Sequence, residues 1–196
     1  MKSLQDMSIL VTGGGSGIGL GTARYCIERG AKVTICGRRE DKIKAAASEL
    51  GDACHGVAAD ITVAADRQKL LGATIDHGGQ LDALVNNAGN MYRGAITELD
   101  ENALQEVFHT NVIAAMMLTG LCAPHLAQRQ GAVVFVGSIH TRRAFPGASP
   151  YAATKAAVQG LTRVLAAEMG EQKISVNCLL PGAVFTEINQ RAGLMD

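Results

Sequence analysis

The chain has 196 residues, of which 47% are hydrophobic and 18% are charged, and its 18 basic residues balance 18 acidic ones. This length and composition fit one globular domain with a substantial core. Because the formal net charge is zero, overall charge indicates neither nucleic acid nor a membrane as a partner, and we expect a small-molecule substrate.

Short apolar runs alternate with longer helical patterns along the whole chain. We expect strands at Ser8–Thr12 and at residues 31–36, 55–60, 81–87, 131–138 and 173–180, separated by helices ending near 29, at 39–50, 63–75 and 102–126, and starting near 151. Strands that are apolar throughout are buried on both faces, and the helices are long enough for crossover connections. The sequence therefore predicts a single α/β domain over 1–196, a doubly wound parallel sheet of the Rossmann type with strand order 3-2-1-4-5-6.

A glycine-rich loop, TGGGSGIG at residues 12–19, follows the first strand. Glycines allow positive φ and a close approach of phosphate to the backbone, and the amides at the start of the next helix attract its charge. A dinucleotide pyrophosphate would fit this loop, although its spacing differs from GxGxxG. The alternative is a strand-to-helix turn without a ligand.

The second strand ends in Gly37, Arg38 and Arg39, where an NAD-binding domain usually has an acid for the ribose 2′-hydroxyl. Arginine holds a 2′-phosphate by bidentate, charge-assisted hydrogen bonds. We therefore expect NADP(H), with NAD(H) less favoured. Alternatively, both arginines are solvated surface charges that pair with Glu40 or Asp41.

Tyr151 and Lys155 lie one helical turn apart, thirteen residues after Ser138, which ends the fifth strand. A free phenol has a pKa of about 10, and an ammonium one turn away is expected to lower that pKa toward neutrality. Ser138 could donate to a carbonyl oxygen that gains negative charge during hydride transfer. Taken alone, Tyr151 would be interpreted as core packing, Lys155 as a solvated charge and Ser138 as a cap. The combination of the three indicates catalysis.

The five cysteines are scattered without a CxxC pair, a pattern that favours reduced thiols over a disulfide framework or a zinc site, and we expect no metal. The first residues lack the hydrophobic region of a signal peptide, and no apolar run reaches the roughly 18 residues of a membrane span. We expect a soluble, cytoplasmic protein.

Taken together, these motifs resemble the short-chain dehydrogenase/reductase family, and within it the 3-oxoacyl-carrier-protein reductase-like members. The resemblance covers nearly the whole chain. It rests on residues 12–19, NNAG at 86–89, Asn111, Ser138, YAATK at 151–155 and PGAVFT at 181–186, which stand in the family's order and spacing.

The resemblance implies a role for each matching residue. Tyr151 is the expected acid/base, Lys155 lowers its pKa and binds the nicotinamide ribose, Ser138 orients the carbonyl, and Asn111 interrupts a helix and holds a water in a proton relay. Without this resemblance, we would interpret Asn111 as a buried side chain with its hydrogen bonds satisfied, Asp60 as a helix cap, and residues 86–89 as a turn. The implied nucleotide contacts are Gly13, Gly15, Ser16, Gly17, Ile18, Gly19, Arg38, Arg39, Asp60, Ile61, Asn87, Ala88, Gly89, Tyr151, Lys155, Pro181, Gly182, Val184 and Thr186.

Two departures from the family pattern bear on function. Ser16 stands where many NADP-preferring members have a basic residue, so the NADP preference rests on Arg38 and Arg39. The chain also ends ten residues after Thr186, where family members generally continue with a substrate-covering lid, a further helix and a seventh strand. We therefore expect the seventh strand and the lid to be missing, as in a truncated or naturally short form.

The leading hypothesis is an oxidoreductase that transfers hydride between NADP(H) and a carbonyl or secondary alcohol. One alternative is a catalytically idle nucleotide-binding scaffold; another, an S-adenosylmethionine-dependent methyltransferase, gives no reason for the Tyr151 and Lys155 pair. Arg142 and Arg143 could meet an anionic group on the substrate or be solvated, while Met91, Tyr92 and Phe145 could form an apolar wall or plain packing. By resemblance, we expect a homodimer or homotetramer that associates through the long helices after the fourth and fifth strands.

Overall fold

The computed structural model describes residues 3–184, in which six strands alternate with helices. The elements are β1 (Ser8–Thr12), α1 (Gly17–Ile27), β2 (Lys32–Gly37), α2 (Glu40–Leu50), β3 (Cys54–Ala58), α3 (Ala64–Gly78), β4 (Ala83–Asn86), η1 (Ile96–Glu98), α4 (Glu101–Phe108), η2 (His109–Ile113), α5 (Ala114–Arg129), β5 (Ala132–Val136), η3 (Ile139–Thr141), α6 (Ser149–Gly170) and β6 (Ser175–Leu179). Each predicted strand is present within a few residues of its expected ends.

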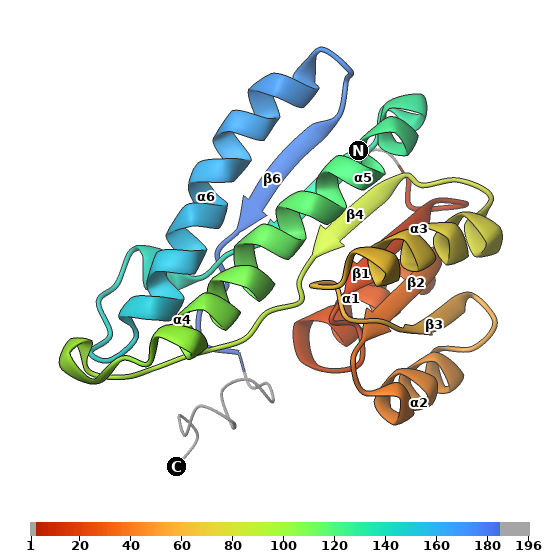
Figure 1. Ribbon diagram of the computed structural model, residues 1–196. Helices are drawn as coiled ribbons and strands as arrows, with labels where there is room; N and C mark the ends of the chain where they lie inside the picture. The colour runs from red at the N-terminus through yellow and green to blue at the C-terminus, as the bar shows by residue number, and fades with distance from the viewer. Residues whose placement is uncertain (1–2, 185–196) are drawn as a thin grey trace.

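All strand pairs in the sheet are parallel, and the order β3-β2-β1-β4-β5-β6 confirms the predicted topology. Helices α1 and α2 contact each other and strands β1 to β3. Helices α3, α5 and α6 cover the other face, where Figure 1 shows them in front of the sheet. Because strand order reverses between β1 and β4, the carboxyl ends of the strands form a crevice at this point.

The two faces of the sheet enclose two separate hydrophobic cores. In β1, Ile9 and Val11 pack in the core beneath α1 and α2, whereas Leu10 packs in the core beneath α3 and α5. Successive side chains of a strand point to opposite faces, so a strand with helices on both sides must be apolar at every position. This explains why continuous apolar runs in the sequence located β1 and the other central strands.

The helical stretch from Glu101 to Arg129 is not one regular helix. Its middle, η2, is a π-helix that contains Asn111, so the implied interruption at this residue is confirmed. The whole stretch is long and apolar enough to cross a membrane by length and composition alone, which the search for unbroken apolar runs missed. However, 44% of its most apolar window is buried inside the protein, and one such helix is weak evidence for a membrane span.

All five cysteines are free thiols. Cys36 and Cys122 are fully buried, and burial raises the pKa of each thiol to about 12. These thiols therefore serve the packing of the core, as their scattered positions predicted.

Candidate functional site

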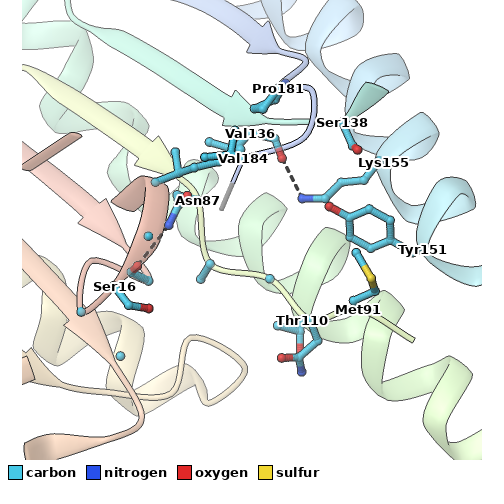
Figure 2. A pocket seen from close by; sticks show the side chains of 18 of the residues that line it. Ser16, Asn87, Met91, Thr110, Val136, Ser138, Tyr151, Lys155, Pro181 and Val184 are labelled. Carbon is cyan, nitrogen blue, oxygen red and sulfur yellow. Dashed lines mark hydrogen bonds between the residues drawn. The ribbon is translucent and has the colours of Figure 1, made fainter. Parts of the chain in front are cut away.

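A cavity of about 450 Å³ opens in the crevice and is lined by loops that follow all six strands. Every predicted nucleotide contact that the structure describes lines this cavity, except Gly19, and Thr186 lies outside the described residues. In Figure 2, Ser16 and Asn87 lie on one side of the cavity, and Ser138, Tyr151 and Lys155 lie together on the other. We call these sides the nucleotide end and the carbonyl end.

The glycine loop at the nucleotide end could not be built with larger side chains. Gly13 has a φ of +66°, and a Cβ there would lie 2.9 Å from the Cα of Ala88. A Cβ at Gly19 would collide with the main-chain oxygen of Gly13, so Gly19 acts in packing α1 against the loop and not as a contact. Ser16 is the N-cap of α1 but its side chain makes no capping bond, so the helix start faces the cavity uncapped. This cradle fits a pyrophosphate.

Asn87 ties the loop after β4 to the glycine loop. Its Nδ2 donates to the main-chain oxygens of Thr12 and Gly13 at 2.8 and 3.1 Å, the second of which is drawn in Figure 2. The Thr12 hydroxyl in turn accepts from the main-chain amides of Asn87 and Ala88 at 3.1 and 3.0 Å. These bonds fix both loops around the nucleotide end.

Three basic side chains line the cavity beyond the glycine loop: Arg38, Arg39 and Lys42. Glu40, which follows Arg39 in the sequence, pairs with Lys44 at 2.7 Å. Sequence reasoning missed Lys42, although its position one turn after the two arginines, at the start of α2, was the available signal. The nucleotide end therefore gathers positive charge where a 2′-phosphate would need it.

Asp60 lines the cavity and also bonds within the turn before α3, but it does not cap that helix, whose N-cap is Val63. Its Oδ1 accepts from the amide and the hydroxyl of Thr62 at 2.9 and 2.7 Å, which shapes the turn before α3. Partial burial works to raise the pKa of Asp60, but the bonds from Thr62 and the charge of Arg38 outweigh it, and the pKa lies below its ordinary value. Asp60 is thus a carboxylate at neutral pH.

At the carbonyl end, Ser138, Tyr151 and Lys155 are all less than 8% exposed. The Lys155 Nζ donates to the main-chain oxygen of Val136 at 2.7 Å and lies 5.5 Å from the centre of the Tyr151 ring (Figure 2). The spacing in the helix therefore does bring the phenol and the ammonium to one face, next to the end of β5.

The expected direction of the Tyr151 pKa is wrong for this structure. Burial raises the pKa of the phenol, and a hydrogen bond with Ser138 offsets only part of that rise. Burial also lowers the pKa of Lys155 to about 8. Sequence spacing sets the proximity of the two groups but not their desolvation, which disfavours the charged form of both.

Asn111 lies behind the cavity and does not line it. Its Oδ1 accepts from the Asn90 amide at 2.7 Å, and its Nδ2 donates to the Asn90 main-chain oxygen and the Thr154 hydroxyl at 2.9 and 3.0 Å. Gly89 lets this loop approach, because a Cβ there would be 3.1 Å from the Asn111 Oδ1. The side chain joins the loop after β4 to α6, so its bonds are those of a satisfied buried asparagine.

Sequence reasoning missed His140, which stands two residues after Ser138. Its Nδ1 lies 3.0 Å from the Ser138 Oγ, and its main-chain amide donates to the same oxygen at 3.2 Å. The ring packs on Phe145 with centroids 4.2 Å apart and meets the Tyr151 ring edge-on at 5.2 Å. His140 thus contacts two of the three candidate catalytic residues. Its place in a Ser-Ile-His turn after the strand was the only sequence signal.

The substrate side of the carbonyl end differs from the expectation. Met91 and Phe145 line the cavity, whereas the Tyr92 hydroxyl turns away to accept from the Asp100 amide at 2.7 Å. Arg142 and Arg143 are exposed and do not line it, because the η3 turn directs them outward. The arginine that does line this end is Arg93.

The model of the short chain dehydrogenase family matches residues 7–195 of this chain. The chain is 33% identical over 194 residues to pig (Sus scrofa) dehydrogenase/reductase SDR family member 4, covering 96% of this chain and 70% of that protein. It is 34% identical over 202 residues to a 3-oxoacyl-[acyl-carrier-protein] reductase of Chlamydia muridarum, covering 98% and 79% of the two chains.

Among solved structures, the fold is similar to a 3-ketoacyl-(acyl-carrier-protein) reductase from Brucella melitensis complexed with NADH. The two superpose with a TM-score of 0.93 at 32% identity, over 96% of this chain and 80% of that one.

Proposed function

The chain belongs to the short-chain dehydrogenase/reductase family, and on that premise we propose that it interconverts a carbonyl group and a secondary alcohol with NADP(H). The observation that carries the proposal is the placement of Ser138, Tyr151 and Lys155 in the same cavity as the glycine loop. Sheets of this kind bind their ligands at the carboxyl ends of the strands, where both groups lie.

Membership of the family supports a nicotinamide cofactor, which would supply or accept hydride. The glycine loop and the start of α1 would hold its pyrophosphate, since Gly13, Gly15 and Gly17 line the cavity beside the uncapped helix start. Arg38, Arg39 and Lys42 favour the 2′-phosphate of NADP(H) over the free hydroxyl of NAD(H). The Brucella relative was solved with NADH, so this preference is a property that we propose for this chain's own residues.

Proton transfer is assigned to Tyr151. In the reducing direction its phenol donates a proton to the carbonyl oxygen as that oxygen gains negative charge, and Ser138 donates a hydrogen bond to the same oxygen. Lys155 is mostly protonated at pH 7, since its pKa is about 8, and an ammonium 5.5 Å from the ring stabilises the phenolate that the transfer leaves behind. Asn111 positions the loop after β4 against α6, which keeps these groups in register.

We also propose a cytoplasmic homodimer or homotetramer. Ile113, Met116 and Met117 on the long helical stretch, together with Val164 on α6, are large hydrophobic side chains between 45% and 55% exposed. Such a face suits association with a second copy. Size-exclusion chromatography with light scattering tests this, and a clean monomer would refute it.

The test of function is NADPH consumption, followed by absorbance, with a panel of ketones, oxo acids and 3-oxoacyl thioesters. We expect carbonyl-dependent oxidation of NADPH that is faster than with NADH. A catalytically idle scaffold instead predicts NADPH binding without turnover of any carbonyl in the panel, and that outcome would replace the proposal.

A further inference from the structure

Arg93 lies in the loop after β4 and lines the carbonyl end of the cavity. Its Nη2 donates to the main-chain oxygen of Pro146 at 3.0 Å, and the next amide, Gly94, donates to the Gly147 oxygen at 2.9 Å. These bonds join the loop after β4 to the loop before α6, two segments more than fifty residues apart. The guanidinium is therefore fixed between the two loops that frame the entrance beside Tyr151.

The charge of Arg93 has no counter-charge within the described part of the chain. No carboxylate of residues 3–184 lies within ion-pair distance of it, and its Nε is buried without a hydrogen-bond partner. Among residues 3–184, the Pro146 oxygen is the one acceptor of the guanidinium, so its other Nη hydrogens have no acceptor in this part of the chain. A half-buried guanidinium normally has an acceptor for such donors, so the missing acceptor is a feature to be explained.

The surroundings place this charge next to the reacting groups. Burial lowers the pKa of His140, and the positive charge of Arg93 lowers it further, so the field of Arg93 reaches the His140 ring. The His140 ring contacts both the Ser138 hydroxyl and the Tyr151 ring. Arg93, His140, Ser138 and Tyr151 line the same cavity. Met91, from the same loop as Arg93, lies beside Tyr151 in Figure 2.

Building on the function proposed above, we propose that Arg93 binds a carboxylate of the substrate, so that the enzyme acts on oxo acids and hydroxy acids in preference to neutral ketones and alcohols. Two parallel N–H donors of a guanidinium match the two oxygens of a carboxylate. A phosphate is the less suitable anion. Lys155 already donates to the Val136 oxygen and lies beside the Tyr151 ring, and the cavity's other basic residues, Arg38, Arg39 and Lys42, lie at the nucleotide end.

The first experiment compares each oxo acid with its own methyl ester, which keeps the carbonyl but removes the charge. The probes are 2-oxobutanoate, 3-oxobutanoate and 4-oxopentanoate, three spacings between carbonyl and carboxylate, each with its ester and with NADPH in excess. We expect at least one acid to have a kcat/KM about ten-fold or more above that of its ester. Esters that match or exceed their acids at all three spacings would overturn the assignment.

The second experiment uses Arg93→Gln, with Arg93→Lys as the conservative variant and Arg143→Gln as a control that removes one charge outside the cavity lining. We expect Arg93→Gln to lower kcat/KM for the preferred acid about 10- to 100-fold, mostly through KM, and to leave the ester within about two-fold. Arg93→Lys should recover part of the lost kcat/KM. Arg143→Gln should leave kcat/KM unchanged for both the acid and the ester. An equal loss for acid and ester would mean a structural role for Arg93 and would refute the proposal.

A binding measurement separates this inference from the function on which it rests. Butanoate and butanamide are titrated into the NADPH-loaded protein, and nicotinamide fluorescence reports their binding without any turnover. Binding of butanoate but not butanamide, lost in Arg93→Gln, supports the carboxylate site even if no carbonyl is reduced. Turnover of neutral ketones combined with no butanoate binding would uphold the proposed function and contradict the site.

Discussion

The two ends of the cavity are built in different ways. The nucleotide end is built largely from two short continuous segments, the glycine loop after β1 and residues 37–42, which carry three basic side chains. The carbonyl end is made of side chains from three stretches: the loop after β4 with Arg93, the loop after β5 with His140 and Phe145, and the start of α6 with Tyr151. Where backbone amides form the binding surface, a side-chain substitution is tolerated as long as its Cβ does not collide with a neighbour. Where side chains form the site, a substitution removes one of the interacting groups.

This difference predicts where single substitutions act. Changes at the carbonyl end should reduce turnover while nucleotide binding persists, and changes at the nucleotide end should alter cofactor choice while the chemistry persists. Lys155 stands where the two ends meet, between the end of β5 and the Tyr151 ring.

The largest effect is expected for Tyr151→Phe, which removes the proton donor and keeps the ring packed against His140. We expect kcat to fall about 10²- to 10⁴-fold with the dissociation constant for NADPH nearly unchanged. Parallel steady-state kinetics and NADPH titration measure this split. Retention of most turnover would remove Tyr151 from the mechanism.

Lys155→Met should increase stability while it reduces turnover. In the unfolded chain the lysine pKa is near 10.5, and in the folded chain it is about 8, so folding carries a penalty of a few kcal/mol below pH 8 that is relieved as pH rises from 8 to 10.5. The free energy of unfolding of the wild type should therefore rise across this window, and that of the variant should not.

Urea denaturation of both proteins at pH 7.5 and 9.5 tests this prediction. The variant also loses the bond to Val136, which lowers its stability equally at both pH values, so the pH dependence is the diagnostic quantity. Because both proteins keep the same cysteines and tyrosines, the titration of those groups cancels in the comparison. Identical pH dependence in the two proteins would show that Lys155 is not desolvated.

Replacing both Arg38 and Arg39 by glutamine should change cofactor choice at the other end. We expect NADPH binding to weaken about 10- to 100-fold, because charge-assisted bonds to the 2′-phosphate are lost, while NADH binding changes little. Fluorescence titration with each nucleotide gives both values from one protein sample. A similar loss of affinity for both nucleotides would indicate that the arginines stabilise the loop and do not bind the 2′-phosphate.

The smallest effect is expected at His140, since it acts through Ser138. His140→Ala should lower kcat about two- to ten-fold by freeing the Ser138 hydroxyl to rotate, and His140→Asn, which keeps a polar atom near the position of Nδ1, should recover most of the rate. Steady-state kinetics with a neutral ketone isolates this effect from any charge on the substrate. If kcat of His140→Asn is no higher than kcat of His140→Ala, the contact between His140 and Ser138 does not contribute to turnover.

The same contrast explains what the sequence could predict. The strands, the glycine loop and the relation of Tyr151 to Lys155 follow from periodicity, from glycine geometry and from spacing within one helix, all of which act over a few residues. Arg93 and His140 acquire their positions only when the loops after β4 and β5 fold together, as the contact of Arg93 with Pro146 shows. The raised pKa of Tyr151 depends on burial, which residue spacing does not report.

Gly19 was expected among the nucleotide contacts, and the sequence left Arg142 and Arg143 open between an anion contact and solvated charges; none of the three lines the cavity. Gly19 packs α1 against the main chain of Gly13 and does not reach the cavity, although it belongs to the same motif as the glycines that do. Arg142 and Arg143 follow Ser138 closely in sequence, but the intervening η3 turn directs both into solvent. Proximity along the chain was a poor guide wherever a tight turn intervened.

The central claim is that one cavity joins an NADP(H)-binding end to a carbonyl-reducing end, and nucleotide titration tests its foundation most directly. Titration of the wild-type chain with NADPH and with NADH, followed by nicotinamide fluorescence, should show saturable binding of both with NADPH at least about ten-fold tighter. Binding of neither nucleotide, or tighter binding of NADH, would contradict the account.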